Sequence, residues 1–551
     1  MKRIALVTTL VAVAVLLGGI ALVPSLYSDN DVIELDILFT SDIHGHIDRN
    51  FATFLNPNFP PPLGGGASAM TYIKRAREEA AAGGRELLFF DSGDIFQGTP
   101  VGMKTKGTTV VKWMNAAGYD AMALGNHEFD HGWENVKRLV ELAEFPMLAA
   151  NLYSAETGKK VDWVGDMLLI EKGDLTIGVV GYVTESTVNM AFSKHVEGLE
   201  FKPIHELMPG HAKELRERGA DLVFVLMHSG LPYKPEMEKN YRLMKEREAE
   251  DGLPHWGMNA MELAHTIWGV DAIFGGHTHQ GYDTPWEDPR THTLVFEPYA
   301  NGSSIGHVTL KIDRETKQVL GFDTHFGRGA LLTLFEEETW PDPVSADTIN
   351  VWVADAEGGL DEVVGETTVL LQRGSPNNAL MGFVIADAFR EIMEVDFAIQ
   401  NTGGVRADIS PGRITRKDLV AVEPFGNAMV VLDLTGAEMK ELLEDKLRGR
   451  GGGIFFSGGK IHYDLEREEG DRIIQFNVND EPIDLNKEYR LAMTDYLAQG
   501  NSGMYRFRDM DPDRFFFSGQ MAREVIAEYI RRYGVISPKN DGRWVKVKSS
   551  S

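Results

Sequence analysis

The stretch "FTSDIHGHID" at residues 39–48 places an aspartate and two histidines directly behind the apolar, β-branched run "VIELDILF". Polar loops at the carboxyl ends of strands are where layered α/β folds build their sites. Asp42-Ile43-His44 is also an ordinary way to open a loop, because aspartate favours turns. The triplet alone therefore favours a polar loop over a metal site.

The same pattern recurs four more times before residue 282. Each time a short apolar run stops at a polar cluster: "ELLFF" at Asp91-Ser92-Gly93-Asp94, "AMAL" at Gly125-Asn126-His127, "DLVFVLM" at His228, and "DAIFGG" at His277 and His279. Helix-length segments with charged faces lie between several of the runs, at 67–82 and 205–220. Strands alternating with helices predict a layered α/β fold whose loops meet at one edge.

The five loops together supply aspartate, asparagine and histidine, and the chain contains no cysteine. A single histidine at a strand end is more often a hydrogen-bonded loop residue than a ligand. A mixed carboxylate and imidazole set of this size, however, indicates two borderline or hard divalent ions such as Zn, Mn, Co or Fe.

These motifs, in this order, resemble those of a known family. "SDIHGHID", "DSGDIFQGT", "GNHEFDHG", "LMHSG" and "GGHTHQG" are similar to the five metal motifs of the calcineurin-like metallophosphoesterases, across residues 36–282. The chain as a whole most resembles the 5'-nucleotidase family, whose exported bacterial members include UDP-sugar hydrolases and 2',3'-cyclic nucleotide phosphodiesterases. The resemblance implies an α/β fold: a four-layer α/β/β/α metal domain and a smaller C-terminal α/β substrate-binding domain.

The resemblance also implies a site. One ion would be held by Asp42, His44 and His279, the other by Asn126, His228 and His277, and Asp94 would bridge them. A hydroxide shared by the ions would attack phosphorus in line. His127 would face the phosphoryl group, and Asp130 would orient its ring and raise its pKa.

The second half of the chain differs from the first in its sequence motifs. Near residue 335, "EEETWPDPVSADTINVWVADAEGG" predicts a linker helix, and no clustered histidines follow it. From periodicity alone, Phe425 and Tyr496 are expected in a core. The resemblance instead implies that they stack on a base, with the loop residues Asn401, Gly403, Gly404 and Arg406 as further substrate ligands. The chain departs from the family pattern at "GNSGMY", where Ser502 stands in place of an aspartate, and in the reduction of an arginine pair to Arg373.

The amino terminus predicts export. Lys2 and Arg3 precede an apolar run without charge until Asp29, so residues 1–28 are expected to be a signal peptide, with an uncleaved membrane anchor over 4–26 as the alternative. Lys+Arg 55 against Asp+Glu 82 gives a net charge of −27, which argues against a nucleic-acid polymer as partner.

Together these features predict a metallophosphoesterase domain at 30–334, a linker helix at 335–360 and a 5'-nucleotidase substrate-binding domain at 361–546. The predicted reaction is hydrolysis of nucleotide phosphate monoesters in the periplasm or outside the cell. Three alternatives stay open: hydrolysis of a UDP-sugar at the same site, hydrolysis of a 2',3'-cyclic nucleotide there, and a secreted or surface-anchored binding protein without turnover. The sequence leaves the oligomeric state open.

Overall fold

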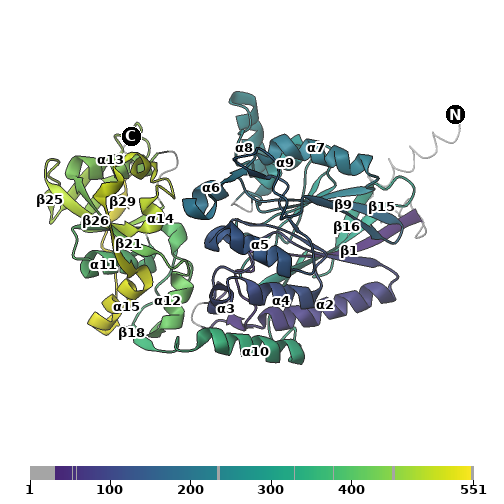
Figure 1. Cartoon of the computed structure of the whole chain (residues 1–551), viewed down its shortest axis with the longest axis horizontal. Helices are drawn as coiled ribbons and strands as arrows, with labels where there is room; N and C mark the ends of the chain where they lie inside the picture. The colour runs from purple at the N-terminus through teal and green to yellow at the C-terminus, as the bar shows by residue number, and fades with distance from the viewer. Residues whose placement is uncertain are drawn as a thin grey trace, which may run out of the picture.

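The computed structural model describes residues 31–547, except 53, 57, 58, 233–235, 328, 377 and 449–452. The predicted signal peptide or anchor at 1–28 lies outside the described residues. Figure 1 shows two domains side by side, with helix α10 (Pro343–Glu357) along the lower edge of the N-terminal one. Among the described helices, none is both long enough and apolar enough to cross a membrane.

Two sheets form the centre of the N-terminal domain. The first has the order β16-β15-β1-β4-β5-β6, with β17 also paired to β15, and its strands are β1 (Val32–Thr40), β4 (Glu86–Asp91), β5 (Ala121–Ala123), β6 (Met147–Leu148), β15 (Ser304–Asp313), β16 (Val319–Thr324) and β17 (Leu331–Thr333). The second has the order β13-β14-β12-β11-β9-β8, formed by β8 (Met167–Lys172), β9 (Leu175–Tyr182), β11 (Leu222–Met227), β12 (Ala272–Phe274), β13 (Trp286–Glu287) and β14 (Leu294–Phe296).

Side-chain alternation decides how these sheets pack. On β1, Leu35, Ile37 and Phe39 enter the core between the two sheets, whereas Leu38 faces the helices. Strand β11 is buried along its whole length, as expected for a parallel strand covered on both faces. The sheets therefore lie face to face.

Helices cover both outer faces. The first sheet packs against α2 (Gly65–Ala82), α4 (Thr108–Ala117) and α5 (Trp133–Leu142), and the second against α7 (Ile204–Glu217), α8 (Met237–Glu250) and α9 (Ala260–Thr266). The result is the α/β/β/α layering expected from the sequence. Shorter elements complete the domain: β2 (Asn50–Phe51), β3 (Pro62–Leu63), β7 (Leu152–Ser154), β10 (Leu199–Phe201), α3 (Pro100–Lys104) and α6 (Thr187–Met190).

Helix α10 lies within the range predicted for a linker helix. The Asp342 side chain caps it by accepting a hydrogen bond from the Ser345 N–H at 2.9 Å. Its apolar residues, among them Ile349 and Ala356, join the core beneath α2 and α3. The helix is thus fixed to the N-terminal domain, and the crossing to the second domain follows it.

The C-terminal domain is built on a five-stranded sheet of order β22-β19-β26-β21-β27. Its strands are β19 (Phe397–Asn401), β21 (Ala428–Thr435), β22 (Ile454–Ser457), β26 (Glu488–Thr494) and β27 (Phe515–Met521). One face packs against α11 (Leu380–Ile392), α12 (Arg416–Val422) and α15 (Ala522–Tyr533), and the other against α13 (Gly436–Lys446). The remaining elements are β18 (Val363–Thr367), β20 (Gly412–Thr415), β23 (Lys460–Tyr463), β24 (Ile473–Val478), β25 (Glu481–Pro482), α14 (Asp495–Ala498), β28 (Val535–Ile536) and β29 (Trp544–Lys546).

Candidate dinuclear metal centre

The predicted metal ligands follow the carboxyl ends of five strands from both sheets of the N-terminal domain. Asp42 and His44 follow β1, Asp94 follows β4, and Asn126 follows β5, all in the first sheet. His228 follows β11, and His277 and His279 follow β12, in the second. Because the two sheets face each other, their loops converge at one end.

The structure brings these side chains into two adjacent groups. In the group Asp42, His44 and His279, and in the group Asp94, His228 and His277, candidate ligand atoms lie within 4.8 Å of one another. His228 Nε2 connects the groups, because it lies 2.9 Å from Asp94 Oδ2 and 3.8 Å from Asp42 Oδ1. Asp94 Oδ2 also lies 4.0 Å from His44 Nε2, so Asp94 is close to both groups.

The backbone at this site is unusual. Asp42, His44, Asp94, His277 and His279 have φ angles of 52°, 51°, 60°, 77° and 59°. Non-glycine residues adopt this left-handed conformation only rarely, and where they do the strain often marks a functional site. Five of the seven predicted ligands thus share a conformation that local sequence does not favour.

Hydrogen bonds to backbone carbonyls orient two of the imidazoles. His44 Nδ1 lies 2.6 Å from the Gln97 carbonyl oxygen, and His228 Nδ1 lies 2.7 Å from that of Ser92. An Nδ1–H that donates to a carbonyl directs Nε2 into the site, where this nitrogen binds a metal once it has lost its proton. Ser41 Oγ and the His277 N–H donate to Asp42 Oδ2 at 2.6 and 2.9 Å, which holds that carboxylate in place.

The charges of the site call for a cation. Burial alone would lower the pKa of His228, but Asp94 and Asp42 outweigh burial and raise it to about 10. Burial alone would likewise raise the pKa of Asp94, yet His228, His127 and His44 hold it well below its ordinary value. Asn126 Oδ1 is buried without a hydrogen-bond partner. Carboxylate, imidazole and amide oxygen are donors that suit borderline divalent ions, so these residues fit a pair of such ions.

Glu128 is a residue of this site that the sequence analysis missed. It is fully buried, and its carboxylate accepts three backbone N–H bonds, from Asp94 at 2.9 Å, Ile95 at 2.9 Å and Gly125 at 2.6 Å. It therefore joins the loop that carries Asp94 to the loop that carries Asn126. Its place two residues after Asn126 in "GNHEFDHG" was the available signal.

His127 and Asp130 form the predicted pair beside the ligands. Asp130 Oδ2 lies 2.8 Å from His127 Nδ1. Burial acts to lower the pKa of His127, but Asp130 and Asp94 together raise it above its ordinary value. The pair therefore favours a protonated imidazole at the edge of the metal centre.

A cavity of about 560 Å³ lies between the two domains. Asn126, His127, Asp130 and His277 line it from the N-terminal domain. All six predicted substrate residues line it from the C-terminal domain, namely Asn401, Gly403, Gly404, Arg406, Phe425 and Tyr496. Further lining residues that the sequence did not indicate are Phe192, Trp256 and Tyr505.

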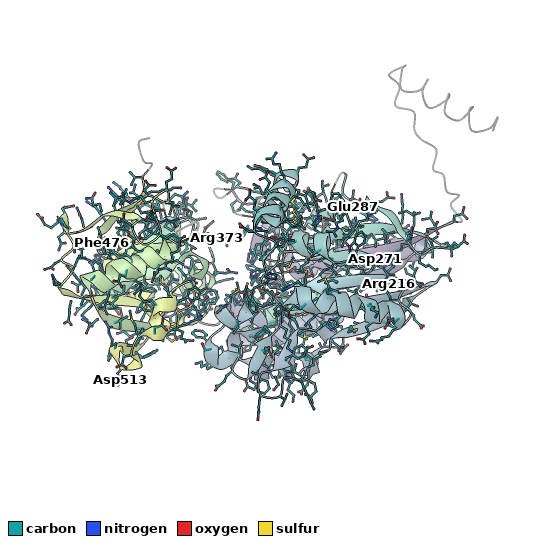
Figure 2. The ribbon with its side chains drawn as sticks, turned by 90° about the horizontal axis from the view of Figure 1, so that it is seen from above. Arg216, Asp271, Glu287, Arg373, Phe476 and Asp513 are labelled. Atoms are coloured by element: carbon teal, nitrogen blue, oxygen red, sulfur yellow. The ribbon has the colours of Figure 1, made fainter. Side chains whose placement is uncertain are left out.

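Arginines from the C-terminal domain reach the metal centre. Arg406 Nη2 lies 3.5 Å from His44 Nε2, and Arg373 Nη1 donates to the Arg406 carbonyl oxygen at 2.8 Å. Figure 2 shows Arg373 on the side of the C-terminal domain that faces the N-terminal domain. Both line a second cavity of about 390 Å³, together with His44 and His279. Positive charge thus lies directly opposite the metal centre.

Comparison with known proteins defines the class. Residues 35–281 match the family model for calcineurin-like phosphoesterases, and residues 363–509 match the model for the 5'-nucleotidase C-terminal domain. The protein is a calcineurin-like phosphoesterase, a phosphoric ester hydrolase of a family that uses two divalent metal ions. With both domains present, it belongs to the 5'-nucleotidase family.

Several named proteins are similar to this chain over nearly its whole length. Snake venom 5'-nucleotidase of Naja atra is 27% identical over 93% of this chain and 98% of its own length, and 5'-nucleotidase of Homo sapiens is 28% identical over 93% and 90%. The crystal structure of a 5'-nucleotidase precursor from Thermus thermophilus superposes with a TM-score of 0.80 at 24% identity, covering 94% of this chain and 99% of that one. At this identity the superposition shows the shared fold.

Proposed function

We propose that the protein is an exported 5'-nucleotidase that releases phosphate from nucleotide monoesters. The supporting observation is the shared cavity, which has the metal centre and His127 on one wall and Arg406, Phe425 and Tyr496 on the other. A phosphate bound at the metal centre would leave its nucleoside directed at the two aromatic rings. We further propose the division into domains at 30–334 and 361–546.

The proposed ligands are Asp42, His44 and His279 for one ion and Asn126, His228 and His277 for the other, with Asp94 between them. When bound, two divalent ions supply charge neutralisation at the phosphoryl oxygens and a water activated for attack on phosphorus. The chain's own residues bind the ester, orient it and supply a proton.

His127 is the proposed proton donor. Its Nδ1 is held by Asp130, so its Nε2–H is available to the oxygen of the leaving nucleoside. Arg406 contributes a partly buried positive charge beside His44, which suits a phosphate in an otherwise acidic protein. Both groups act on the reacting end of the substrate.

Phe425 and Tyr496 are the proposed base-binding residues. Phe425 lies next to His127, with ring centroids 5.8 Å apart, and so is close to the phosphate end of the cavity. Tyr496 also lines the cavity, and its ring meets Phe192 of the N-terminal domain edge to face with centroids 6.1 Å apart. Stacking on aromatic rings stabilises a bound base by roughly 1–3 kcal/mol per stack.

Additional aromatic residues of the cavity favour a second candidate substrate. Trp256 and Tyr505 are exposed and line the cavity in addition to Phe425 and Tyr496, and Ser502 leaves the position of the family aspartate uncharged. A larger nucleotide, such as a nucleotide sugar, would fit these features on the same metal centre.

Export is part of the proposal. It is supported by Lys2, Arg3 and the apolar run that follows them, and by relatives named as venom proteins.

Hydrolysis of a substrate panel tests the function. The panel contains 5'-AMP, a UDP-sugar, 2',3'-cyclic AMP and ribose 5-phosphate, each with and without Mn²⁺ or Zn²⁺. Free phosphate is measured for the two monoesters, and the nucleotide product is measured by chromatography for the UDP-sugar and the cyclic nucleotide, whose first cleavage frees no phosphate. We expect metal-dependent hydrolysis that is fastest for the 5'-nucleotide, and loss of that hydrolysis in Asp94→Asn. Faster hydrolysis of the UDP-sugar would replace the substrate proposal, and absence of metal-dependent hydrolysis of every ester would refute the enzyme mechanism.

A further inference from the structure

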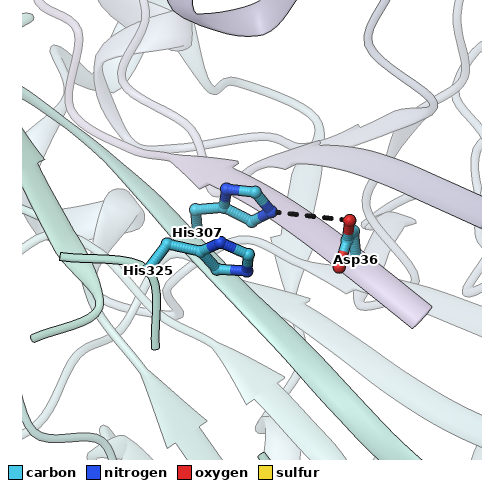
Figure 3. Close-up of side chains that lie close together, drawn as sticks. All are labelled: Asp36, His307 and His325. Carbon is cyan, nitrogen blue, oxygen red and sulfur yellow. Dashed lines mark ion pairs between the residues drawn. The ribbon is translucent and has the colours of Figure 1, made fainter. Parts of the chain in front are cut away.

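A second cluster of metal-ligating side chains lies in the first sheet, away from the metal centre. Asp36 is on β1, His307 is on β15, and His325 directly follows β16. Figure 3 shows the two imidazole rings one above the other, with Asp36 beside the edge of His307. Asp36 precedes Asp42 by six residues, about 20 Å along an extended strand, so this cluster is separate from the catalytic one.

The hydrogen bonds of His307 leave one nitrogen without a partner. Its Nδ1 lies 2.7 Å from the Tyr72 hydroxyl of α2. Its Nε2 is buried, has no hydrogen-bond partner, and lies 3.9 Å from Asp36 Oδ2. An imidazole held through one nitrogen while the other faces a carboxylate is the usual arrangement of a metal-binding histidine.

The two rings have the protonation state that metal binding requires. Their centroids are 3.6 Å apart and their planes differ by 6°, a contact that two charged imidazoles would not tolerate. Burial lowers the pKa of His307 to about 3, with His325, Arg85 and Arg75 acting in the same direction. Burial also lowers the pKa of His325. Both rings are therefore neutral near pH 7, the form that binds an ion. His325 Nε2 contacts the Thr309 hydroxyl at 2.8 Å, and an ion bound through this nitrogen would replace that hydrogen bond.

We propose that Asp36, His307 and His325 bind a further divalent ion of the imidazole-preferring class, such as Zn²⁺. Candidate ligand atoms of the three residues lie within 4.8 Å of one another, so small side-chain shifts bring them onto one ion. Asp36 and His307 are buried and His325 is exposed, which gives the ion a path from solvent. Water completes its coordination on the exposed side.

The ion would compete with a neighbouring arginine. Arg85 Nε donates to Asp36 Oδ2 at 3.0 Å, and the Thr309 hydroxyl donates to Asp36 Oδ1 at 2.5 Å. The Arg85 side chain is 24% exposed, so it can turn towards solvent when an ion takes its place. Bound there, the ion connects β1, β15 and β16 and stabilises this edge of the sheet.

The test compares the zinc content of purified wild-type protein with that of His325→Ala. Each protein is stripped with a chelator, loaded with Zn²⁺ and measured by elemental mass spectrometry. Because His325 is exposed, its truncation leaves the fold and the catalytic centre intact. We expect wild type to retain one ion more per chain than His325→Ala, with phosphate release the same in both. His462→Ala, which removes a histidine of β23 in the other domain, should retain as many ions as wild type.

Two further variants keep the test decisive. Asp36→Asn preserves shape and removes the carboxylate charge, and it should lose the same ion. Arg85→Gln removes the competing guanidinium, and it should bind that ion more tightly and show a larger Zn²⁺-induced rise in Tm. Equal zinc content in wild type and His325→Ala, together with no tighter binding in Arg85→Gln, would overturn the proposal and leave the cluster as an Asp36–Arg85 ion pair beside stacked histidines.

Discussion

Glu128→Gln should weaken the metal centre although Glu128 is not one of its proposed ligands. The carboxylate accepts two N–H bonds through Oε2, from Asp94 and Gly125, and one through Oε1, from Ile95. A glutamine keeps one acceptor oxygen, and its NH₂ group then faces the Ile95 N–H. One buried donor left unsatisfied costs about 1–3 kcal/mol. If that cost is relieved by movement of the Asp94 loop, kcat falls about 5- to 150-fold.

The assay measures kcat with 5'-AMP, metal content and Tm for Glu128→Gln and for a matched control. Glu444 provides the control, because its buried carboxylate accepts N–H bonds from Arg472 at 2.9 Å and Ile473 at 2.8 Å within the C-terminal domain. Both variants should lower Tm, but only Glu128→Gln should lower kcat and metal retention. The reasoning is refuted if Glu128→Gln loses stability as Glu444→Gln does while it keeps wild-type kcat and metal content.

Three other substitutions probe the proton donor, the base site and a buried acid. Asp130→Asn should lower kcat roughly 100-fold with little change in KM, because His127 loses the partner that orients its ring and raises its pKa. An unchanged kcat would exclude that role for Asp130. Phe425→Ala should raise KM for 5'-AMP about 5- to 150-fold, since about 1–3 kcal/mol of stacking on the base is lost. The KM for ribose 5-phosphate, which has no base, should stay the same. An equal rise in KM for both substrates would count against base stacking. Burial raises the pKa of Glu423 from 4.5 to about 7. The folded state therefore binds this proton more tightly than the unfolded state does. The free energy of unfolding consequently falls as pH rises from 4.5 through 7. Glu423→Gln should therefore gain up to about 3 kcal/mol relative to wild type between pH 5 and pH 8.5 in urea unfolding, and a constant difference across that range would contradict the assignment.

The alternation of strands and helices and the gathering of polar loops at one edge could be predicted from the sequence because both follow from local patterns. The four-layer arrangement and the assignment of ligands to each ion followed only from the resemblance to a family. Apolar runs that end in Asp, Asn or His mark strands whose carboxyl ends carry loops, and the order of five such motifs matches a known family. Helices expected at 67–82 and 205–220 occur as α2 and α7. The expected linker range contains α10.

Other features depend on contacts between segments that are far apart in the sequence, and such contacts cannot be predicted from the local sequence pattern. Glu128 accepts the Asp94 N–H, and the Asp42 N–H donates to the Gly93 carbonyl oxygen, so contacts between separate loops hold the left-handed backbone at Asp42 and Asp94. Asp36 and His307 meet because β1 and β15 pair antiparallel, with Asp36 opposite Thr309. The sequence did not indicate Trp256 and Tyr505 as cavity residues, because an aromatic residue in a single sequence is expected in a hydrophobic core unless another observation places it elsewhere.

The division of the cavity between two domains bears on what happens after the ester bond breaks. Under the proposed function, inorganic phosphate would remain with the N-terminal domain and the nucleoside with the aromatic pair of the other, so the two products would no longer be tied to one another. Separation of the domains would then release both at once, and a nucleoside analogue that binds Phe425 and Tyr496 tightly would inhibit by occupying only the C-terminal half.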